Sequence, residues 1–237
     1  WKVKEWKGTL FPAKAKPNTW LHYTASTFDF IEFGATFYGT PKPQVLEGWL
    51  NSLKGTNCLL FPKMNISVSH YKRLRDSAIK TDEFLVCCEQ LGNHLGGVLL
   101  QLPDHYSVLK NKETFKAYLN HWPQDVKLFV EIREDAFFES INEQQELLKF
   151  MRDLGIGLVV TDTNLKRDVL HQYLTTKDLY IRFQSNNFHP TDSVRLNDWM
   201  LNIKELGDMG LANAYFAMHT PAMSAMPHFV DYFKQLK

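Results

Sequence analysis

Seven short apolar runs recur along the chain, and each leads to a polar or charged residue. They are rich in β-branched, aliphatic or aromatic side chains. In order, the runs are FDFIEF around Glu32, CLLFPK to Lys63, GVLLQL to Gln101, KLFVEIR through Glu131 and Arg133, GLVVTD to Asp162, LYIRFQ through Arg182, and AYFAMH to His219. A strand that is buried on both faces needs nearly continuous apolar character, so a polar residue at its end costs free energy unless it belongs to a site. The pattern predicts seven strands with a site at their ends.

Segments with helical spacing of apolar residues lie between most of these runs. The predicted helices cover residues 43–53, 71–91, 111–122, 141–154, 166–174, 196–209 and 226–236. Strands that alternate with helices, joined by connections too long for hairpins, indicate parallel pairing. Polar ends on all seven strands favour a closed barrel, because an open sheet gathers its ligand near one switch point.

We therefore expect an α/β fold, a TIM-like (β/α) barrel, as a single domain over residues 1–237. A barrel of this kind needs eight strands, and the sequence shows seven. Residues 1–6 carry charges that suit a rim better than a barrel wall. We expect the first strand to be missing from this chain and to precede Trp1.

Composition narrows the choice of partners. The chain has 237 residues, 44% of them hydrophobic, and a formal net charge of +1. Proteins that hold nucleic acid by charge alone are usually strongly basic, so bulk charge does not favour that partner. No stretch approaches the ~20 apolar residues that span a bilayer, and no membrane partner is expected. Cys58, Cys87 and Cys88 are too few for a disulfide framework, so we expect reduced thiols and a cytoplasmic protein.

Six segments, in order, carry a resemblance to a known family. They are WKGTLFP at 6–12, EFGATFY at 32–38, SHYKRL at 69–74, LQLP at 100–103, VEIR at 130–133 and YIRF at 180–183. Together they resemble the YecE-like family, domain of unknown function DUF72. The resemblance implies a TIM-like barrel with a polar pocket at its carboxyl-end mouth, and no established reaction. It also implies a Gly-rich first strand that ends at a Trp matching Trp1. The chain has Gly34 where the family pattern usually has Asn.

Three carboxylates are candidates for proton transfer. A closed barrel would bring Glu32, Glu131 and Asp162 to one mouth although they are far apart in sequence. Paired carboxylates divide acid and base roles when their surroundings separate their pKa values. With His219 they could also bind a divalent metal. The alternative is structural, with Glu131 paired to Arg133 or Arg182 and Asp162 capping the next helix.

Cations are predicted at the same mouth. Lys63, Arg133 and Arg182 end strands, and Lys72, Arg73 and Arg75 would open a helix directly after His70. Arginine forks match phosphate or carboxylate oxygens, and lysine acts as a point charge. A mixed site of this kind suits an anionic ligand. The residues after His70 could instead form a solvated helix face. Lys63 could form a Schiff base if its pKa is lowered, although pairing with Glu32 or Glu131 is the alternative.

His70 is the best single candidate for proton transfer, because an ordinary histidine titrates near pH ~6.5. Its alternative role is to hold the loop before it. Phe37 and Tyr38 could stack on a sugar or base at the mouth, or belong to the core or rim. The chain contains no Gly-x-Gly-x-x-Gly after a strand, no Walker A loop, no His-Glu-x-x-His and no Gly-x-Ser-x-Gly, which argues against nucleotide cofactors and against those hydrolase classes.

The leading hypothesis is an enzyme-like barrel that binds a small phosphate- or carboxylate-bearing ligand. Acid and base roles fall to Glu32, His70, Glu131 and Asp162. Ligand binding falls to Tyr38, Lys63, Lys72, Arg73, Gln101, Arg133, Arg182 and His219. No cofactor is expected, with a divalent metal left open. One alternative is a metal-dependent phosphodiesterase or nuclease. Another is a non-catalytic module that binds nucleic acid through the basic residues after His70.

Overall fold

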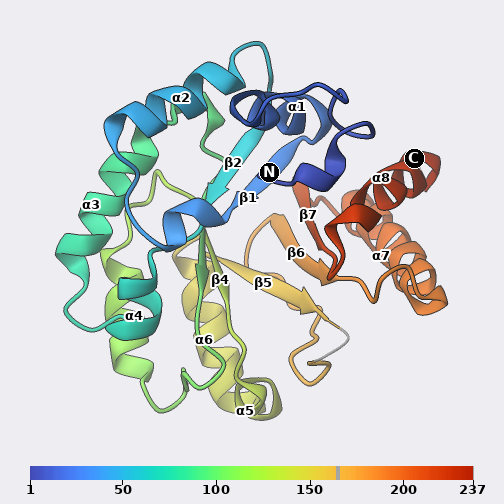
Figure 1. Cartoon of the computed structure of the whole chain (residues 1–237). Coiled ribbons are helices and arrows are strands. Elements are labelled where there is room, and N and C mark those ends of the chain that lie inside the picture. Colours follow the sequence, from blue (N-terminus) through green and yellow to red (C-terminus); the bar gives the residue numbers. More distant parts are fainter. Residues whose placement is uncertain (164–165, 237) are drawn as a thin grey trace.

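The computed structural model describes residues 1–163 and 166–236, which form an α/β fold around parallel strands (Figure 1). The strands are β1 (Phe30–Phe33), β2 (Leu59–Pro62), β3 (Val98–Gln101), β4 (Leu128–Glu131), β5 (Gly157–Asp162), β6 (Asp178–Gln184) and β7 (Asn213–His219). The helices are α1 (Trp20–Thr27), α2 (Pro43–Leu53), α3 (Ala78–Glu89), α4 (Lys112–His121), α5 (Asp135–Glu139), α6 (Ile141–Asp153), α7 (Pro190–Asp208) and α8 (Met226–Leu236). All seven predicted runs contain a strand.

The strands form two parallel sheets. A curled sheet of five strands runs in the order β3-β4-β5-β6-β7, and β1 pairs with β2 in a second sheet. The sheets approach each other between β2 and β3, where Met64 N donates to Leu99 O at 2.8 Å and Gly96 N donates to Leu60 O at 2.9 Å. Between β7 and β1 the described residues form no strand ladder. The expected TIM-like barrel is thus confirmed as a curled parallel α/β fold, but not as a fully closed barrel.

Alternate residues of each strand face the concave side of the strands. One apolar layer there takes a side chain from all seven strands: Phe30, Phe61, Leu99, Phe129, Val159, Tyr180 and Tyr215. Ring centroids of Phe61 and Tyr215 are 4.7 Å apart, and those of Phe129 and Tyr180 are 5.1 Å apart. Because strand side chains have a period of two, the next residue on the same side lies one step nearer the carboxyl end. In six strands this next residue is polar, and in β7 it is Ala217, with His219 two residues further on.

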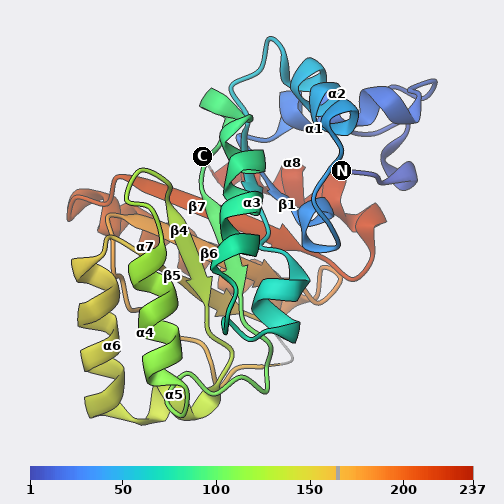
Figure 2. The same cartoon turned by 90° about the vertical axis from the view of Figure 1, so that its left-hand side faces the viewer.

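Helices cover the other side of the strands (Figures 1 and 2). The residues that alternate with the inward ones pack there: Ile31 and Phe33 face α1 and α2, Val98 and Val130 belong to a cluster with α3, α4 and α6, and Ile181 and Phe183 belong to one with α7 and α8. Burial on both sides explains the near-continuous apolar character of the runs. None of the described helices is long and apolar enough to cross a membrane.

The predicted helix at 166–174 is wrong, because this segment has no helical structure. His171 within this segment and Thr175 directly after it bond to backbone atoms in or next to β5 instead. His171 Nε2 lies 3.1 Å from Val159 O, while Thr175 Oγ1 accepts from Leu158 N at 2.8 Å and donates to Ile156 O at 2.7 Å. Val169 is fully buried. These contacts satisfy backbone groups that would otherwise be unpaired, so tertiary bonding outweighs helical periodicity here.

The predicted helix at 71–91 starts later than expected. It begins at Ala78, and Ser67–Tyr71 forms a short π-helical turn before it. Between the two, Arg73, Leu74 and Asp76 have positive φ values of 49°, 69° and 44°. Left-handed backbone interrupts a helix, so the basic residues after His70 lie in a tight turn and do not open α3. The structure also adds α1, which the sequence pattern did not predict.

Candidate functional site

Arg182 is the centre of a polar cluster at the carboxyl ends of the strands. It lies on β6, and its guanidinium donates from Nε to Glu32 Oε2 at 2.9 Å and from Nη2 to Glu32 Oε1 at 2.8 Å. Its Nη1 donates to Glu131 Oε2 at 2.5 Å and to Gln101 Oε1 at 3.1 Å. One arginine therefore joins β1, β3, β4 and β6. We call Glu32, Gln101, Glu131, Arg133, Arg182 and His219 the mouth cluster.

Glu131 is the most deeply buried carboxylate of the mouth cluster, with no exposed surface. Besides Arg182, it accepts from Arg133 Nε at 2.8 Å and from Thr161 Oγ1 at 3.0 Å. Burial alone would raise the pKa of Glu131, but Arg182 and then Arg133 outweigh burial and lower it. Three donors therefore keep this carboxylate ionised. The sequence analysis missed Thr161, although it stands two residues after inward-facing Val159.

Glu32 has the same kind of environment. Burial would raise its pKa, but Arg182 and then His219 lower the pKa below the ordinary value. His219 is 41% exposed, and its Nε2 lies 3.4 Å from Glu32 Oε2 and 3.5 Å from Arg182 Nη2. A protonated ring can donate to Glu32, and a neutral ring can accept from Arg182. Tyr180 also reaches Glu32, with 3.4 Å between its hydroxyl and Oε2.

The pairing alternative for Glu131 matches the geometry, because it binds both Arg133 and Arg182. Arg182 is tightly held in turn: burial would lower its pKa, but Glu131 and then Glu32 raise it. Arg133 has a freer position, with a side chain 25% exposed and a second contact of 3.3 Å to the exposed Asp104. Arg133 thus keeps part of its guanidinium open to solvent at the mouth.

Lys63 differs from these arginines. It follows β2, is half-buried, and is in no ion pair within the described residues. Its ammonium nitrogen lies 4.1 Å from the centre of the Phe37 ring, a cation–π contact. Burial lowers the pKa of Lys63, and Arg182 lowers it further; the opposing effects of Glu32 and Glu131 are smaller. The alternative of a carboxylate partner for Lys63 is therefore not seen as a direct contact.

His70 and Lys63 both contact the Phe37 ring. The His70 and Phe37 rings are perpendicular, with centroids 5.1 Å apart. Burial lowers the pKa of His70, and the positive charge of Lys63 lowers it further. Ser69 Oγ lies 2.8 Å from His70 Nδ1 and donates to Asn65 O at 3.2 Å. His70 thus combines the expected hold on its loop with a place next to the mouth lysine.

Asp162 is not brought together with the mouth cluster. Its neighbour Thr161 faces the concave side, so Asp162 faces the helices. It accepts from Trp199 Nε1 at 2.7 Å and from Arg195 Nη1 at 2.8 Å, and it also pairs with Arg167. Asp162 is 2% exposed. Through Trp199 and Arg195 it ties α7 to β5. Its role is structural, as the alternative supposed, but it caps no helix, because no helix follows β5 at residues 166–174.

The remaining predicted residues lie at the rim. Tyr38 is 82% exposed, with its ring 5.1 Å from that of Phe37. Lys72 Nζ donates to Asp76 O within its own turn, and Arg73 Nη2 lies 3.2 Å from His105 Nε2. Neither joins the mouth cluster by a hydrogen bond. Asp104 and His105, which the sequence analysis did not consider, reach the rim from the segment after β3.

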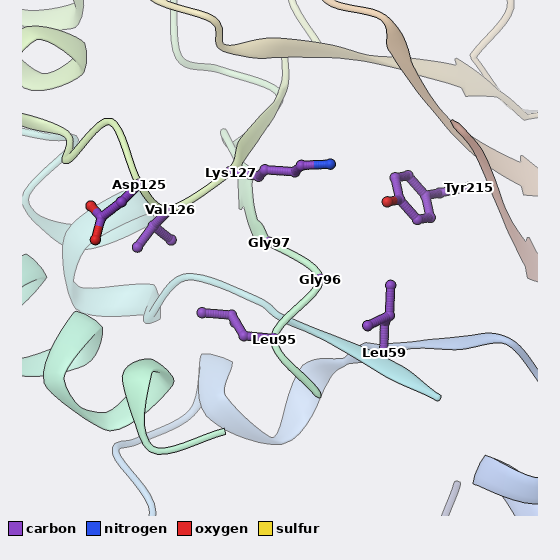
Figure 3. A pocket seen from close by; sticks show the side chains of 8 residues that line it. All are labelled: Leu59, Leu95, Gly96, Gly97, Asp125, Val126, Lys127 and Tyr215. Carbon is purple, nitrogen blue, oxygen red and sulfur yellow. The ribbon is translucent and has the colours of Figure 1, made fainter. Parts of the chain in front are cut away.

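In residues 1–163 and 166–236, no group of three or more His, Cys, Asp or Glu side chains is placed to hold a metal ion. A cavity of about 220 Å³ lies at the opposite, amino end of the strands, lined by Leu59, Leu95, Gly96, Gly97, Asp125, Val126, Lys127 and Tyr215 (Figure 3). In Figure 3 the Lys127 amine reaches toward the Tyr215 hydroxyl. Lys127 Nζ also pairs with Asp178 at 2.7 Å.

Comparison with known proteins identifies the family of this chain. A family model described as "Protein of unknown function DUF72" matches residues 1–237. The chain belongs to the DUF72 family. It is 24% identical over 232 residues to UPF0759 protein YecE of Escherichia coli strain K12, covering 90% of this chain and 83% of that protein. The same protein of E. coli O157:H7 matches equally.

A DUF72 family protein from Enterococcus faecalis V583 shares the fold. Its crystal structure at 2.52 Å resolution superposes with a TM-score of 0.73 and 14% identity, covering 92% of this chain and 94% of that one. A second structure, at 3.10 Å, gives the same TM-score with 13% identity, covering 91% and 87%. The family resemblance of the six sequence segments is confirmed.

Proposed function

We propose that this DUF72 protein binds a small phosphate- or carboxylate-bearing ligand at the carboxyl ends of its strands. The observation that carries the proposal is Lys63, a half-buried cation beside the mouth cluster without an ion-pair partner in the described chain. A charge removed from water is costly unless it is paired. An anion that binds there would supply the pairing that the protein does not.

The charge balance supports the same conclusion. Lys63, Arg133 and Arg182 bring three positive charges, and the buried Glu32 and Glu131 bring two negative ones. The remaining carboxylate, Asp104, is 59% exposed and screened by solvent. Arg182 is saturated by two carboxylates, so Lys63 and the exposed part of Arg133 are the groups available to a ligand. We take the strands as a TIM-like barrel in this proposal, since all seven contribute to one inward layer.

Acid and base roles follow from the same geometry. Glu131 is fully buried and committed to three donors, which suits it to positioning Arg133 and Arg182. His70 is the group that can exchange a proton near Lys63, because burial and Lys63 lower its pKa and favour the neutral ring. Gln101, His219 and Tyr38 would contact the ligand around this centre.

Titration calorimetry with inorganic phosphate, pyrophosphate and citrate at constant ionic strength tests the proposal. The wild-type protein should bind at least one of them, and Lys63→Met should weaken binding by about tenfold or more, because one charge-assisted hydrogen bond contributes about 1.5–3 kcal/mol. Lys127→Met is the matched control, since Lys127 lies at the other end of the strands and has its own carboxylate. Equal binding in both variants would refute the proposal, as would no binding to the wild type.

A second candidate is the nucleic-acid module. Tyr38 and Tyr71 are 82% and 75% exposed, and both flank the Phe37–His70 contact next to the basic turn at Lys72 and Arg73. Exposed aromatic rings beside cations suit single-stranded nucleic acid. Binding of a labelled oligonucleotide that weakens with salt, and that is lost when both tyrosines are changed to Ala, would favour this function over a small ligand.

A further inference from the structure

Lys63 is held by backbone bonds on both sides. Its N–H donates to Phe33 O at 3.1 Å, and its carbonyl accepts from Thr36 Oγ1 at 2.8 Å. A parallel bridge also pairs it with Leu99 of β3. The start of the lysine side chain is therefore fixed between β1 and β3, and only the four-carbon stem can move. A backbone fixed in this way gives a reactive side chain a reproducible position.

The surroundings favour an amine at this position. Lysines that form imines are held in apolar or cationic surroundings, which shift the equilibrium from the ammonium ion toward the nucleophilic amine. Lys63 is half-buried and has Arg182 and Arg133 as nearby positive charges, which favour the amine, whereas its cation–π contact with Phe37 favours the ammonium ion. Burial and these charges lower its pKa, whereas Lys127 at the other end has a raised pKa, because Asp178 and Tyr215 together outweigh the effect of burial.

His70 supplies a proton carrier next to this amine. The Ser69 hydroxyl has one hydrogen, and when that hydrogen goes to Asn65 O, His70 Nδ1–H donates to Ser69 Oγ. Nε2 of the neutral ring then has a free lone pair. The charge of Lys63 lowers the pKa of His70, so the lysine is close enough to act on the histidine proton. Lys63, His70 and the partly exposed Arg133 therefore lie together at the carboxyl ends of the strands.

We propose that Lys63 forms an imine with a small aldehyde or ketone whose phosphate or carboxylate group is held by Arg133; this deepens, and rests on, the anion-binding function proposed above. The Nζ lone pair attacks the carbonyl carbon, the carbonyl π electrons move to oxygen, and one of the two protons on the nitrogen passes through His70 to that oxygen. A carbinolamine results. His70 then removes the proton from nitrogen and delivers it to the hydroxyl, so that water leaves as the C=N bond forms. Carbonyl compound and amine become imine and water, with no change of oxidation state.

Reductive trapping tests the imine. The purified protein is incubated with pyruvate or glyceraldehyde 3-phosphate and sodium cyanoborohydride, and the labelled lysines are located by peptide mass spectrometry. We expect the label on Lys63 to exceed that on Lys127 by about tenfold or more, since prior binding of the anionic group concentrates the carbonyl at the amine. Lys63→Arg should lose this label, and Lys127→Arg should keep it. Excess phosphate should protect Lys63.

The outcomes separate the two proposals. If calorimetry shows phosphate binding but Lys63 is labelled no more than Lys127, the imine is refuted and the anion site stands. If neither binding nor selective labelling occurs, both proposals are refuted. If Lys63 is labelled selectively but phosphate gives no protection, the amine is reactive without an anion site, which overturns the inference as stated.

Discussion

The two ends of the strands each present a lysine beside a tyrosine or phenylalanine ring, yet they differ in charge balance. At the amino end, Lys127 pairs with Asp178 at 2.7 Å and lines the 220 Å³ cavity of Figure 3. At the carboxyl end, Lys63 has the Phe37 ring but no ion pair in the described part of the chain. Open space and unpaired charge therefore lie at opposite ends of the strands, and our proposal follows the charge. An uncompensated charge on a rigid frame is the stronger signal.

We expect the ion pairs at the carboxyl end to stabilise the fold more than the ion pair at the amino end. Replacing Arg182 with Met would leave Glu32 without its bidentate partner and Glu131 without one of two arginines, so we expect a loss of about 3–5 kcal/mol in the free energy of unfolding. Lys127→Met removes a half-exposed pair and should cost under about 1 kcal/mol. Urea unfolding of both variants measures this contrast. Equal losses would mean that Arg182 is not the centre of the mouth cluster.

At the amino ends of the strands, Gly96 is packed closely against Phe61 and Leu59. A Cβ on Gly96 would lie 2.4 Å from Phe61 Cε2 and 3.0 Å from Leu59 Cβ, and Phe61 is fully buried. Gly96→Ala should therefore cost about 1–3 kcal/mol. Gly48→Ala is the control: this glycine is inside α2 with nothing within 4 Å, and alanine there should add about 0.5–1 kcal/mol. Thermal or urea unfolding distinguishes the two, and a neutral Gly96→Ala would contradict the packing.

The mouth cluster predicts sensitivity to acid. Arg182 and His219 together outweigh burial and hold the pKa of Glu32 below its ordinary value of 4.5. A carboxylate with a lowered pKa stabilises the fold above pH 4.5 and loses this contribution as pH falls below it, at up to about 1.4 kcal/mol per pH unit. Glu32→Gln removes one such group, so the stability gap between wild type and variant should shrink from pH 7 to pH 3. A constant gap in urea unfolding at the two pH values would contradict the ion pair.

The smallest effect on stability is expected at Lys63. Because Lys63→Met breaks no ion pair, the free energy of unfolding should change by less than about 1 kcal/mol, while anion binding is lost. Unfolding and calorimetry on the same sample measure the two effects. A large loss of stability would show that Lys63 serves the fold, contrary to its proposed role.

The apolar runs predicted the strands and most of the mouth cluster, whereas the helical spacing predicted the helices less well. Seven apolar runs located the strands, and six of the residues named at their ends, Glu32, Gln101, Glu131, Arg133, Arg182 and His219, meet in the mouth cluster. The fifth run ended at Asp162, and the prediction failed there because the last residue of a run does not show which side of the strand it faces; Asp162 faces the helices. Counting by two from Val159 would have selected Thr161 instead.

The errors in the helices have physical causes. Residues 166–174 have helical spacing, but His171 and Thr175 bond to backbone atoms of the β5 segment. The turn at Arg73 adopts left-handed backbone that only its tertiary setting explains. Neither the charge state of Lys63 nor its missing carboxylate could be predicted from sequence, because both depend on which neighbours the curled sheet brings within reach.

The central claim is that Lys63 is an uncompensated cation at an anion site, and NMR titration of ¹³C,¹⁵N-labelled lysine side chains tests it most directly. Lys63 and Lys127 can be assigned from the Lys63→Met and Lys127→Met variants. We predict that Lys63 titrates below the ordinary value of 10.5 and Lys127 above it, and that inorganic phosphate raises the pKa of Lys63 alone. A Lys63 that titrates at or above 10.5 and does not respond to phosphate would contradict the account.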